Sequence, residues 1–249
     1  MKLQGDQASL YLSGQDVPIP ECNIVVHQPT IKQIVMFKES HFLAGVGILA
    51  HAKENANRVR ENNSSAYQFS DFQILLAVIT QDSDINSSVD SLFQLIFPQY
   101  KVVITNEEIY FYDGERRAGM VYERNYDAFI NTIDKLFTLP SDRKKEYNPA
   151  NEKARKIAEK FKARDEILAK KKGREDGSPS LFGTYVSVLS IGMHLDMNIL
   201  WNYTPFQLYD TFKRYWQKNS SDFYQKISTT PLMDTSNMDA PDPWTDNLY

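Results

Sequence analysis

A glycine pattern in the first third of the chain comes nearest to a known ligand-binding motif. Gly45, Gly47 and Ala50 match the loose G-x-G-x-x-A spacing with which dinucleotide-binding proteins bring backbone amides close to a pyrophosphate. That chemistry needs a buried strand before the first glycine and a helix that begins at it. The residues on both sides already have helical periodicity. We therefore expect a packing role for these glycines and predict no cofactor.

The side chains that could act as acids, bases, nucleophiles or metal ligands are scattered. Glu107 and Glu108 are adjacent, so they diverge on a strand or helix and are not placed to act as a catalytic pair. Ser187, Ser190 and Cys22 lack the local motifs of catalytic nucleophiles. We predict no catalytic residue and no metal site, and hence a protein that is not an enzyme. The histidines lack the one-turn spacing of a metal pair: His27, His41, His51 and His194.

Composition and charge limit the partners and the compartment. A net charge of −4 and a pI near 5.6 give no overall reason to expect nucleic acid or an anionic membrane as a partner. Cys22 is the only cysteine, which fits a reducing compartment. The longest apolar run, Phe42 to Ala50, is far shorter than the roughly 20 residues that a spanning helix needs. We expect no membrane segment and a location in the cytoplasm.

Residues 148–180 have a local excess of positive charge. Between Pro149 and Glu175, ten Lys or Arg stand against five Asp or Glu, and the few apolar residues have helical spacing. Such a helix could contact phosphates, but the acidic residues recur at about one-turn spacing, which favours a solvated helix. Gly173 to Ser180 then has the composition of a flexible linker. We predict a basic helix followed by a linker, and we do not expect nucleic acid as a partner.

The elements that must carry these residues are mostly helices. Thr30, Ser70 and Thr204 each precede a glutamine by three residues, the capping-box spacing that begins a helix. Between Tyr100 and Val121, runs of β-branched and aromatic residues surround the turn dipeptide Asp113-Gly114, which predicts a three-stranded meander. The predicted fold class is therefore α+β, predominantly helical, with a small antiparallel β meander around residues 100–122.

Shifts in composition divide the chain into three predicted parts. Residues 1–147 form an N-terminal α+β domain, residues 148–180 the basic helix and linker, and residues 181–249 a C-terminal helical domain with an extended acidic tail. Residues 1–20 end in two prolines and indicate an extended arm. Residues 53–68 lose apolar periodicity and indicate a loop.

The C-terminal stretch from Leu181 to Ile227 contains most of the helix signals. Thr204 closes a capping box with Gln207, and Pro205 occupies the first helical position. An apolar stripe follows on the predicted helix, and we expect its members to be structural and buried. The members that we single out are Leu208, Phe212 and Trp216.

The acidic tail, residues 229–249, is the predicted binding segment. It contains three prolines, four aspartates and no basic residue, a composition typical of extended backbone. Trp244 is the predicted anchor for a partner protein, assisted by Leu248 and Tyr249, because isolated aromatic residues often anchor interfaces. An alternative is that the tail only seals the C-terminal helices of its own chain.

Several stretches together resemble a class of bacteriophage proteins. They are the proline-rich start, PTIKQIVMF, YNPANEKARKIAEK, YVSVLSIGMHLDMNILWNYTPFQLYDTFKRY and the Trp near the end. The likeness spreads over most of the chain and is most specific at residues 202–208, 212–215 and 244–249. These stretches are similar to tail assembly chaperones, which are encoded among tail genes and keep the tape-measure protein soluble until the tail tube forms around it.

The resemblance implies a non-enzymatic assembly factor in the host cell cytoplasm. Its expected partner is the tape-measure protein or another tail component, with self-association as a further option and neither a membrane nor a cofactor. An alternative is a structural subunit of the tail or baseplate, which would be found in the virion. An enzyme is the third interpretation, and it would need a concave site with convergent polar groups that only the folded chain could assemble.

Overall fold

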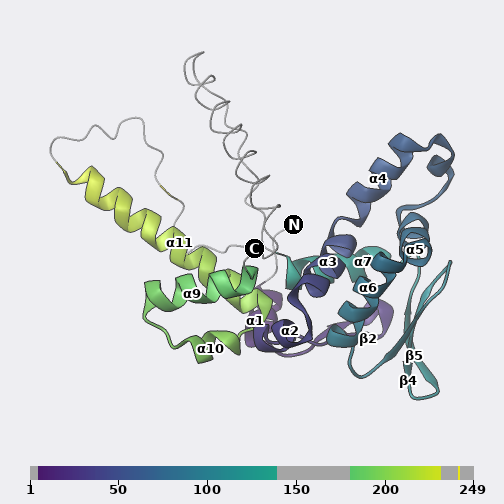
Figure 1. Ribbon diagram of the computed structural model, residues 1–249, viewed down its shortest axis with the longest axis horizontal. Helices are drawn as coiled ribbons and strands as arrows, with labels where there is room; N and C mark the ends of the chain where they lie inside the picture. The colour runs from purple at the N-terminus through teal and green to yellow at the C-terminus, as the bar shows by residue number, and fades with distance from the viewer. Residues whose placement is uncertain (1–4, 139–179, 231–240, 242–249) are drawn as a thin grey trace, which may run out of the picture.

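The computed structural model describes residues 5–138, 180–230 and 241 (Figure 1). The predicted basic helix lies outside the described residues, as does the predicted linker except for Ser180. In chain order the described α-helices are α1 (Gly5–Ser13), α2 (Ile31–Phe37), α3 (Glu39–Ala50), α4 (Ala52–Asn62), α5 (Asp71–Gln81), α6 (Ser83–Ile96), α7 (Tyr126–Phe137), α9 (Leu181–Met193), α10 (Met197–Trp201) and α11 (Pro205–Ser228). The predicted fold class, α+β and predominantly helical, is confirmed.

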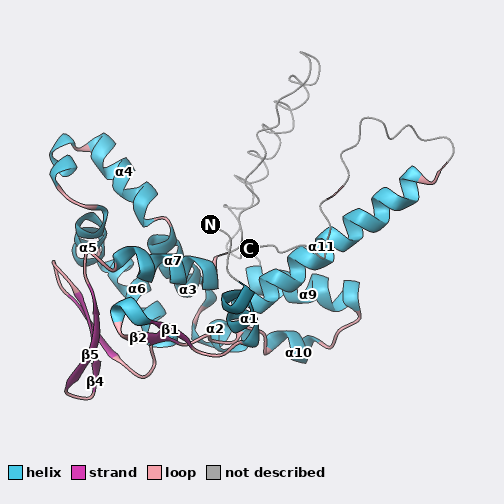
Figure 2. Ribbon diagram, turned by 180° about the vertical axis from the view of Figure 1, so that it is seen from behind, coloured by secondary structure: helices cyan, strands magenta, loops and turns pink. Residues whose placement is uncertain are grey.

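Two small antiparallel sheets accompany the helices (Figure 2). The predicted meander is present as strands in the order β3-β4-β5, with a bulge between Phe111 and Tyr112. Gly114 has φ of 60° in the turn between β4 and β5, a left-handed conformation that glycine adopts without strain. The second sheet is the hairpin β1-β2, connected by the short 3-10 helix η1. The bounds are β1 (Val17–Ile19), η1 (Pro20–Cys22), β2 (Ile24–Val26), β3 (Lys101–Ile104), β4 (Ile109–Asp113) and β5 (Arg116–Val121).

Three helices begin at the predicted capping boxes. Thr30, Ser70 and Thr204 each accept a hydrogen bond from the backbone N–H three residues later, and the glutamine at that position accepts one from the backbone N–H of the cap. Each box satisfies donors that the first turn of a helix leaves without an intrahelical partner. Local sequence chemistry therefore determines where α2, α5 and α11 begin.

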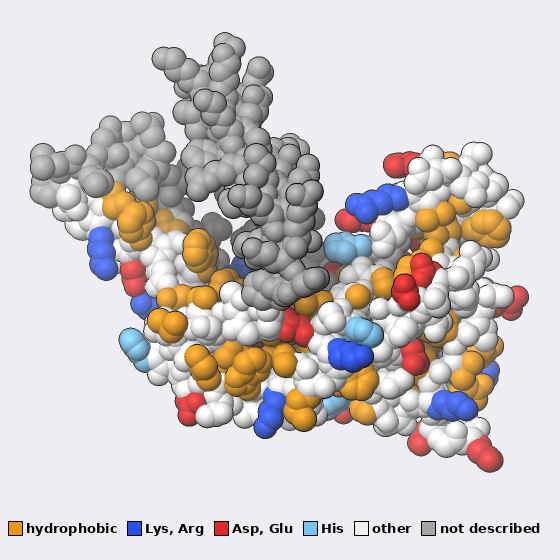
Figure 3. Space-filling view, viewed as in Figure 1, with side chains coloured by type: hydrophobic (Ala, Val, Ile, Leu, Met, Phe, Trp, Pro, Cys, Tyr) orange, Lys and Arg blue, Asp and Glu red, His pale blue; other side chains and the backbone are white. Residues whose placement is uncertain are grey.

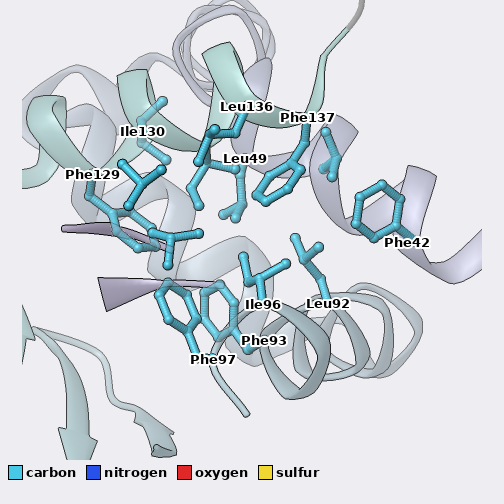
Figure 4. Packing of buried hydrophobic residues seen from close by; sticks show 14 of the residues in the cluster. Phe42, Leu49, Leu92, Phe93, Ile96, Phe97, Phe129, Ile130, Leu136 and Phe137 are labelled. Atoms are coloured by element: carbon cyan, nitrogen blue, oxygen red, sulfur yellow. The ribbon is translucent and has the colours of Figure 1, made fainter. Parts of the chain in front are cut away.

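The centre of the core is aromatic, and Figure 4 shows its buried side chains from α3, α6 and α7. Phe111 of β4 packs against the same cluster. The ring of Phe97 lies 4.8 Å from that of Phe111 and 6.2 Å from that of Phe129, measured between centroids. Helices α3 and α6 pack closely at Gly45. A Cβ atom added there would lie only 2.8 Å from the Ser88 carbonyl oxygen, so the absence of a side chain permits the close contact. Gly45 is thus inside a helix and serves close packing, as its sequence context favours.

The structure contradicts the predicted loop at residues 53–68. Those residues form α4 and the 3-10 helix η2 (Ser64–Gln68). The buried side of α4 consists of Ala52 and Ala56, so the apolar signal in the sequence is weak although the helix is regular. Arg60 holds α4 against the start of α5 through an ion pair of 2.7 Å with Asp71.

The extended arm predicted for residues 1–20 is also wrong for most of its described length. Residues 5–13 form α1, and only β1 is extended. Tyr11 on α1 is buried against Phe206 on α11, with 5.3 Å between ring centroids. The Gln207 side chain also donates a 2.7 Å hydrogen bond to the Leu12 carbonyl. A long-range contact with α11 therefore stabilises a helix that the local pattern does not indicate.

The C-terminal helices α9, α10 and α11 pack against the first half of the chain (Figures 1 and 2). Glu39, at the start of α3, accepts hydrogen bonds from the backbone N–H groups of Leu181 and Phe182 at 2.6 Å and 3.1 Å. The Ser180 hydroxyl donates to the other carboxylate oxygen of Glu39. One buried apolar cluster includes residues from both predicted domains. The three-part division of the chain stays a prediction.

Candidate interaction surface

Helix α11 is buried at its beginning and exposed at its end. Its first turns bury Phe206, Leu208 and Tyr209. From residue 216 to residue 228 no side chain of this helix is buried. In this outer half Trp216 is 63% exposed and Phe223 is 60% exposed. Two large aromatic side chains in solvent are unusual on one helix, since such residues normally lie in cores or interfaces.

The exposed aromatics lie on the same helical face as the buried ones. Trp216 follows Tyr209 by seven residues and precedes Phe223 by seven, which at 3.6 residues per turn is close to two full turns each time. Ser220 and Ile227 complete this face at intervals of four, three and four residues. We call Trp216, Ser220, Phe223 and Ile227 the outer α11 stripe. The face that builds the core therefore continues beyond the core.

Helix α9 covers only the inner part of this face. The ring of Tyr185 lies 4.5 Å from Phe212 between centroids, and Phe182 stacks on Tyr209 at 6.0 Å. Near the end of α9, Tyr215 lies directly over Gly192, where a Cβ atom would come within 2.1 Å of the tyrosine oxygen. Helix α9 ends one residue later, and α11 extends past it (Figure 1).

The prediction that Leu208, Phe212 and Trp216 form one buried stripe is correct only in part. Leu208 is fully buried, and Phe212 is partly buried against the core. Trp216 is exposed. Periodicity predicts which residues share a face, whereas burial also needs an element that covers that face, and α9 ends before it reaches Trp216.

Helix α11 has a net positive charge from residue 213 onward, around the stripe. Residues 213–228 contain four Lys or Arg and one Asp. Lys218 pairs with Asp222 through a contact of 2.8 Å. One turn before the stripe, the Arg214 Nε donates to both carboxylate oxygens of the buried Asp210, at 3.0 Å and 3.2 Å. An apolar stripe with basic flanks favours a binding partner that is apolar and acidic.

A second apolar surface lies between α2 and α10. Met36 is 79% exposed, and Ile199 is 51% exposed. A shallow groove of about 410 Å³ lies beside Met36, and Figure 3 shows hydrophobic side chains over these two helices. The residues that line the groove are Lys32, Val35, Met36, Asn198, Trp201 and Asn202.

The residues that could do chemistry remain apart in the structure. Burial, with a smaller contribution from Glu21, raises the pKa of the Cys22 thiol to about 12, so it is not a thiolate at neutral pH. His27 lies 2.8 Å from Asp16, and His51 lies 3.4 Å from Glu54. Within the described part of the chain, no three His, Cys, Asp or Glu residues lie close enough together to hold a metal ion.

The predicted partner-binding residues Trp244, Leu248 and Tyr249 lie outside the described residues. The sequence did not indicate the exposure of Trp216 and Phe223. Their seven-residue spacing was visible, but the end of the covering helix α9 was not predictable to the residue.

Comparison of the chain with protein-family models, curated proteins and solved structures finds no match. None of the helices in residues 5–138 and 180–230 is long and apolar enough to cross a membrane.

Proposed function

We propose that the protein is a non-enzymatic assembly factor that holds a helical segment of a partner protein on the outer α11 stripe. In the phage context that the resemblance implies, the partner is the tape-measure protein or another tail component, and the binding takes place in the host cell cytoplasm. The observation that supports this proposal is the continuation of the α11 apolar face beyond the core, with Trp216 and Phe223 exposed.

The spacing of the stripe suits a helical partner. Intervals of four, three and four residues place one side chain per turn along a narrow seam, the arrangement with which two helices pack side by side. Ser220 is small and lies between Trp216 and Phe223, so it leaves room for a side chain of the partner. Grooves and faces of this kind bind amphipathic helices through anchors at the same spacing.

The size of the stripe suits reversible binding. An aromatic side chain buries about 150–250 Å², so the exposed fractions of Trp216 and Phe223 together offer roughly 250 Å². Permanent interfaces bury about 1,000 Å² or more on each partner. A contact centred on two aromatic anchors therefore favours a factor that binds and releases over a permanent subunit.

The test is co-purification with the tape-measure protein encoded in the same genome. Trp216→Glu with Phe223→Glu should reduce capture of the co-expressed tape-measure protein at least about tenfold, equivalent to about 1.4 kcal/mol. Tyr67→Glu is the matched control, since Tyr67 is an equally exposed aromatic residue, at 67%, on η2. Equal capture by both variants would refute the proposal.

Mass spectrometry of mature particles separates this function from the structural alternative. An assembly factor should be absent from purified virions, whereas a tail or baseplate subunit should be present in fixed stoichiometry. Detection at subunit stoichiometry would replace the proposed function with the structural one.

A further inference from the structure

The chain contains a segment whose composition complements the outer α11 stripe. Residues 229–249 follow α11 directly and contain four aspartates and no Lys or Arg. Residues 213–228 of α11 contain four Lys or Arg and one Asp. Arg214 pairs with Asp210 and Lys218 pairs with Asp222, so the positive charge that the tail can meet comes from Lys213 and Lys226. The same segment contains the apolar residues Trp244 and Leu248, which could replace water on the exposed aromatic side chains. The tail and the end of α11 therefore have opposite charges, and both contain apolar side chains that could pack together.

We propose that the acidic tail, residues 229–249, binds back onto the outer α11 stripe of its own chain, with Trp244 as the anchor beside Trp216 and Phe223. In this role the tail occupies the surface that the partner helix uses, so it acts as an internal competitor that the partner displaces. The competition rests on the proposed function, whereas the contact between tail and stripe does not.

The geometry of the chain permits this contact. Trp216 lies twelve residues before the end of α11 at Ser228, which is about 18 Å along the helix at 1.5 Å per residue. Trp244 lies fourteen residues after Thr230, and an extended chain of that length spans up to about 46–50 Å. The tail can therefore turn back at Thr230 and reach every position of the stripe.

Covalent connection favours the tail over a free competitor of equal affinity. A short flexible connection gives an effective concentration in the millimolar range, so even a weak contact is populated within one chain. The contact should also be sensitive to salt, because it joins aspartates of the tail to Lys213 and Lys226 at an exposed site. A partner helix that binds more tightly can displace such a tail, as the proposed function requires.

Hydrogen exchange in the full chain tests the contact. Since no side chain of residues 216–228 is buried by the described fold, their amides should exchange readily unless the tail covers the helix. We expect amides of residues 216–228 to exchange about tenfold faster when the chain is truncated after Thr230, and also in the full-length variant Trp244→Ala. Ser236→Ala, in the same segment, is the matched control and should leave exchange unchanged.

Two further variants and a concentration series sharpen the result. Lys213→Glu with Lys226→Glu should accelerate exchange as Trp244→Ala does, whereas Lys32→Glu on α2 should not. Should the truncated chain fail to fold, Trp244→Ala and the lysine variants carry the test alone. Unchanged exchange in Trp244→Ala would overturn the proposal. Protection that grows with protein concentration would also overturn it, because the tail would then bind a second copy.

The outcome is distinguishable from failure of the proposed function. If Trp216→Glu with Phe223→Glu loses the tape-measure protein but Trp244→Ala leaves exchange unchanged, the partner site stands and the tail contact is wrong. If Trp244→Ala accelerates exchange but the stripe variants still capture the tape-measure protein, the tail contact stands and the partner site is wrong. If the partner site and the tail contact are both correct, Trp244→Ala should also increase capture of the tape-measure protein, because the tail then no longer competes for the stripe.

Discussion

Replacement of Glu39 by alanine should weaken the attachment of α9 to α3. One carboxylate oxygen of Glu39 accepts hydrogen bonds from the backbone N–H groups of Leu181 and Phe182, and the other accepts one from the Ser180 hydroxyl. These groups are 141 to 143 residues from Glu39 in sequence. The first turn of α9 thus depends on a carboxylate from another helix for two of its donors.

The expected loss follows from two known effects. Removal of a side chain that caps a helix costs about 0.5–2 kcal/mol. Loss of a negative charge near the positive end of a helix dipole costs a further amount of about 0.3–1 kcal/mol. Glu39→Ala should therefore lower the free energy of unfolding by about 1–3 kcal/mol, and the melting temperature by about 2–4 °C for each kcal/mol in a chain of this size.

Urea denaturation followed by circular dichroism measures this loss, and hydrogen exchange of α9 locates it. Glu39→Gln keeps an acceptor but removes the charge, so it should lose only about 0.3–1 kcal/mol. Glu54→Ala is the matched control, since Glu54 is 69% exposed and pairs only across one turn with His51. If Glu39→Ala and Glu54→Ala agree within about 0.5 kcal/mol, the helix-to-helix cap does not stabilise the fold.

Three further outcomes test the packing and titration of the core. Gly119→Ala should cost about 1–3 kcal/mol in urea denaturation, because the added Cβ would lie 2.3 Å from the Cys22 carbonyl oxygen, whereas Gly47→Ala, with open space around it, should not destabilise. Leu208→Ala should cost about 2–5 kcal/mol, whereas Trp216→Ala, which can remove only the contact with the tail, should cost no more than about 1.4 kcal/mol. Equal losses for the two variants in calorimetry would show that the exposed stripe belongs to the core. Burial raises the pKa of Cys22 from 9.0 to about 12, so its protonated form favours the fold. Stability should therefore be full below pH 9.0, decline between pH 9.0 and about 12, and decline less steeply in Cys22→Ala when unfolding is measured along a pH series.

The parts of the fold that were predictable from sequence depend on local chemistry. The capping boxes at Thr30, Ser70 and Thr204 need only residues three apart, and the structure confirms all three. The meander was predictable because β-branched and aromatic runs alternate with the turn at Asp113-Gly114. Asn125 immediately precedes α7 but does not cap it with its side chain. That side chain accepts from the Tyr122 N–H and donates to the carbonyls of Met120 and Glu21, so it joins β5 to η1.

The parts that were not predictable depend on contacts between distant segments. Helix α4 buries alanines, which carry too little apolar signal to distinguish it from a loop. Helix α1 is stabilised by Phe206, 195 residues after Tyr11, and no window of the sequence contains both. For the candidate site, the sequence placed Trp216 on the correct face but could not show that α9 ends before covering it.

The contact between α1 and α11 has a consequence for how the protein is made. Ribosomes add about 5–20 residues per second, so roughly 10–40 seconds separate the synthesis of Tyr11 from that of Phe206. During this interval Tyr11 has no ring to pack against, and α1 is a nine-residue helix, too short to persist by itself in water. Helix α1 therefore cannot complete its packing before α11 has been made, although α1 is synthesised long before α11.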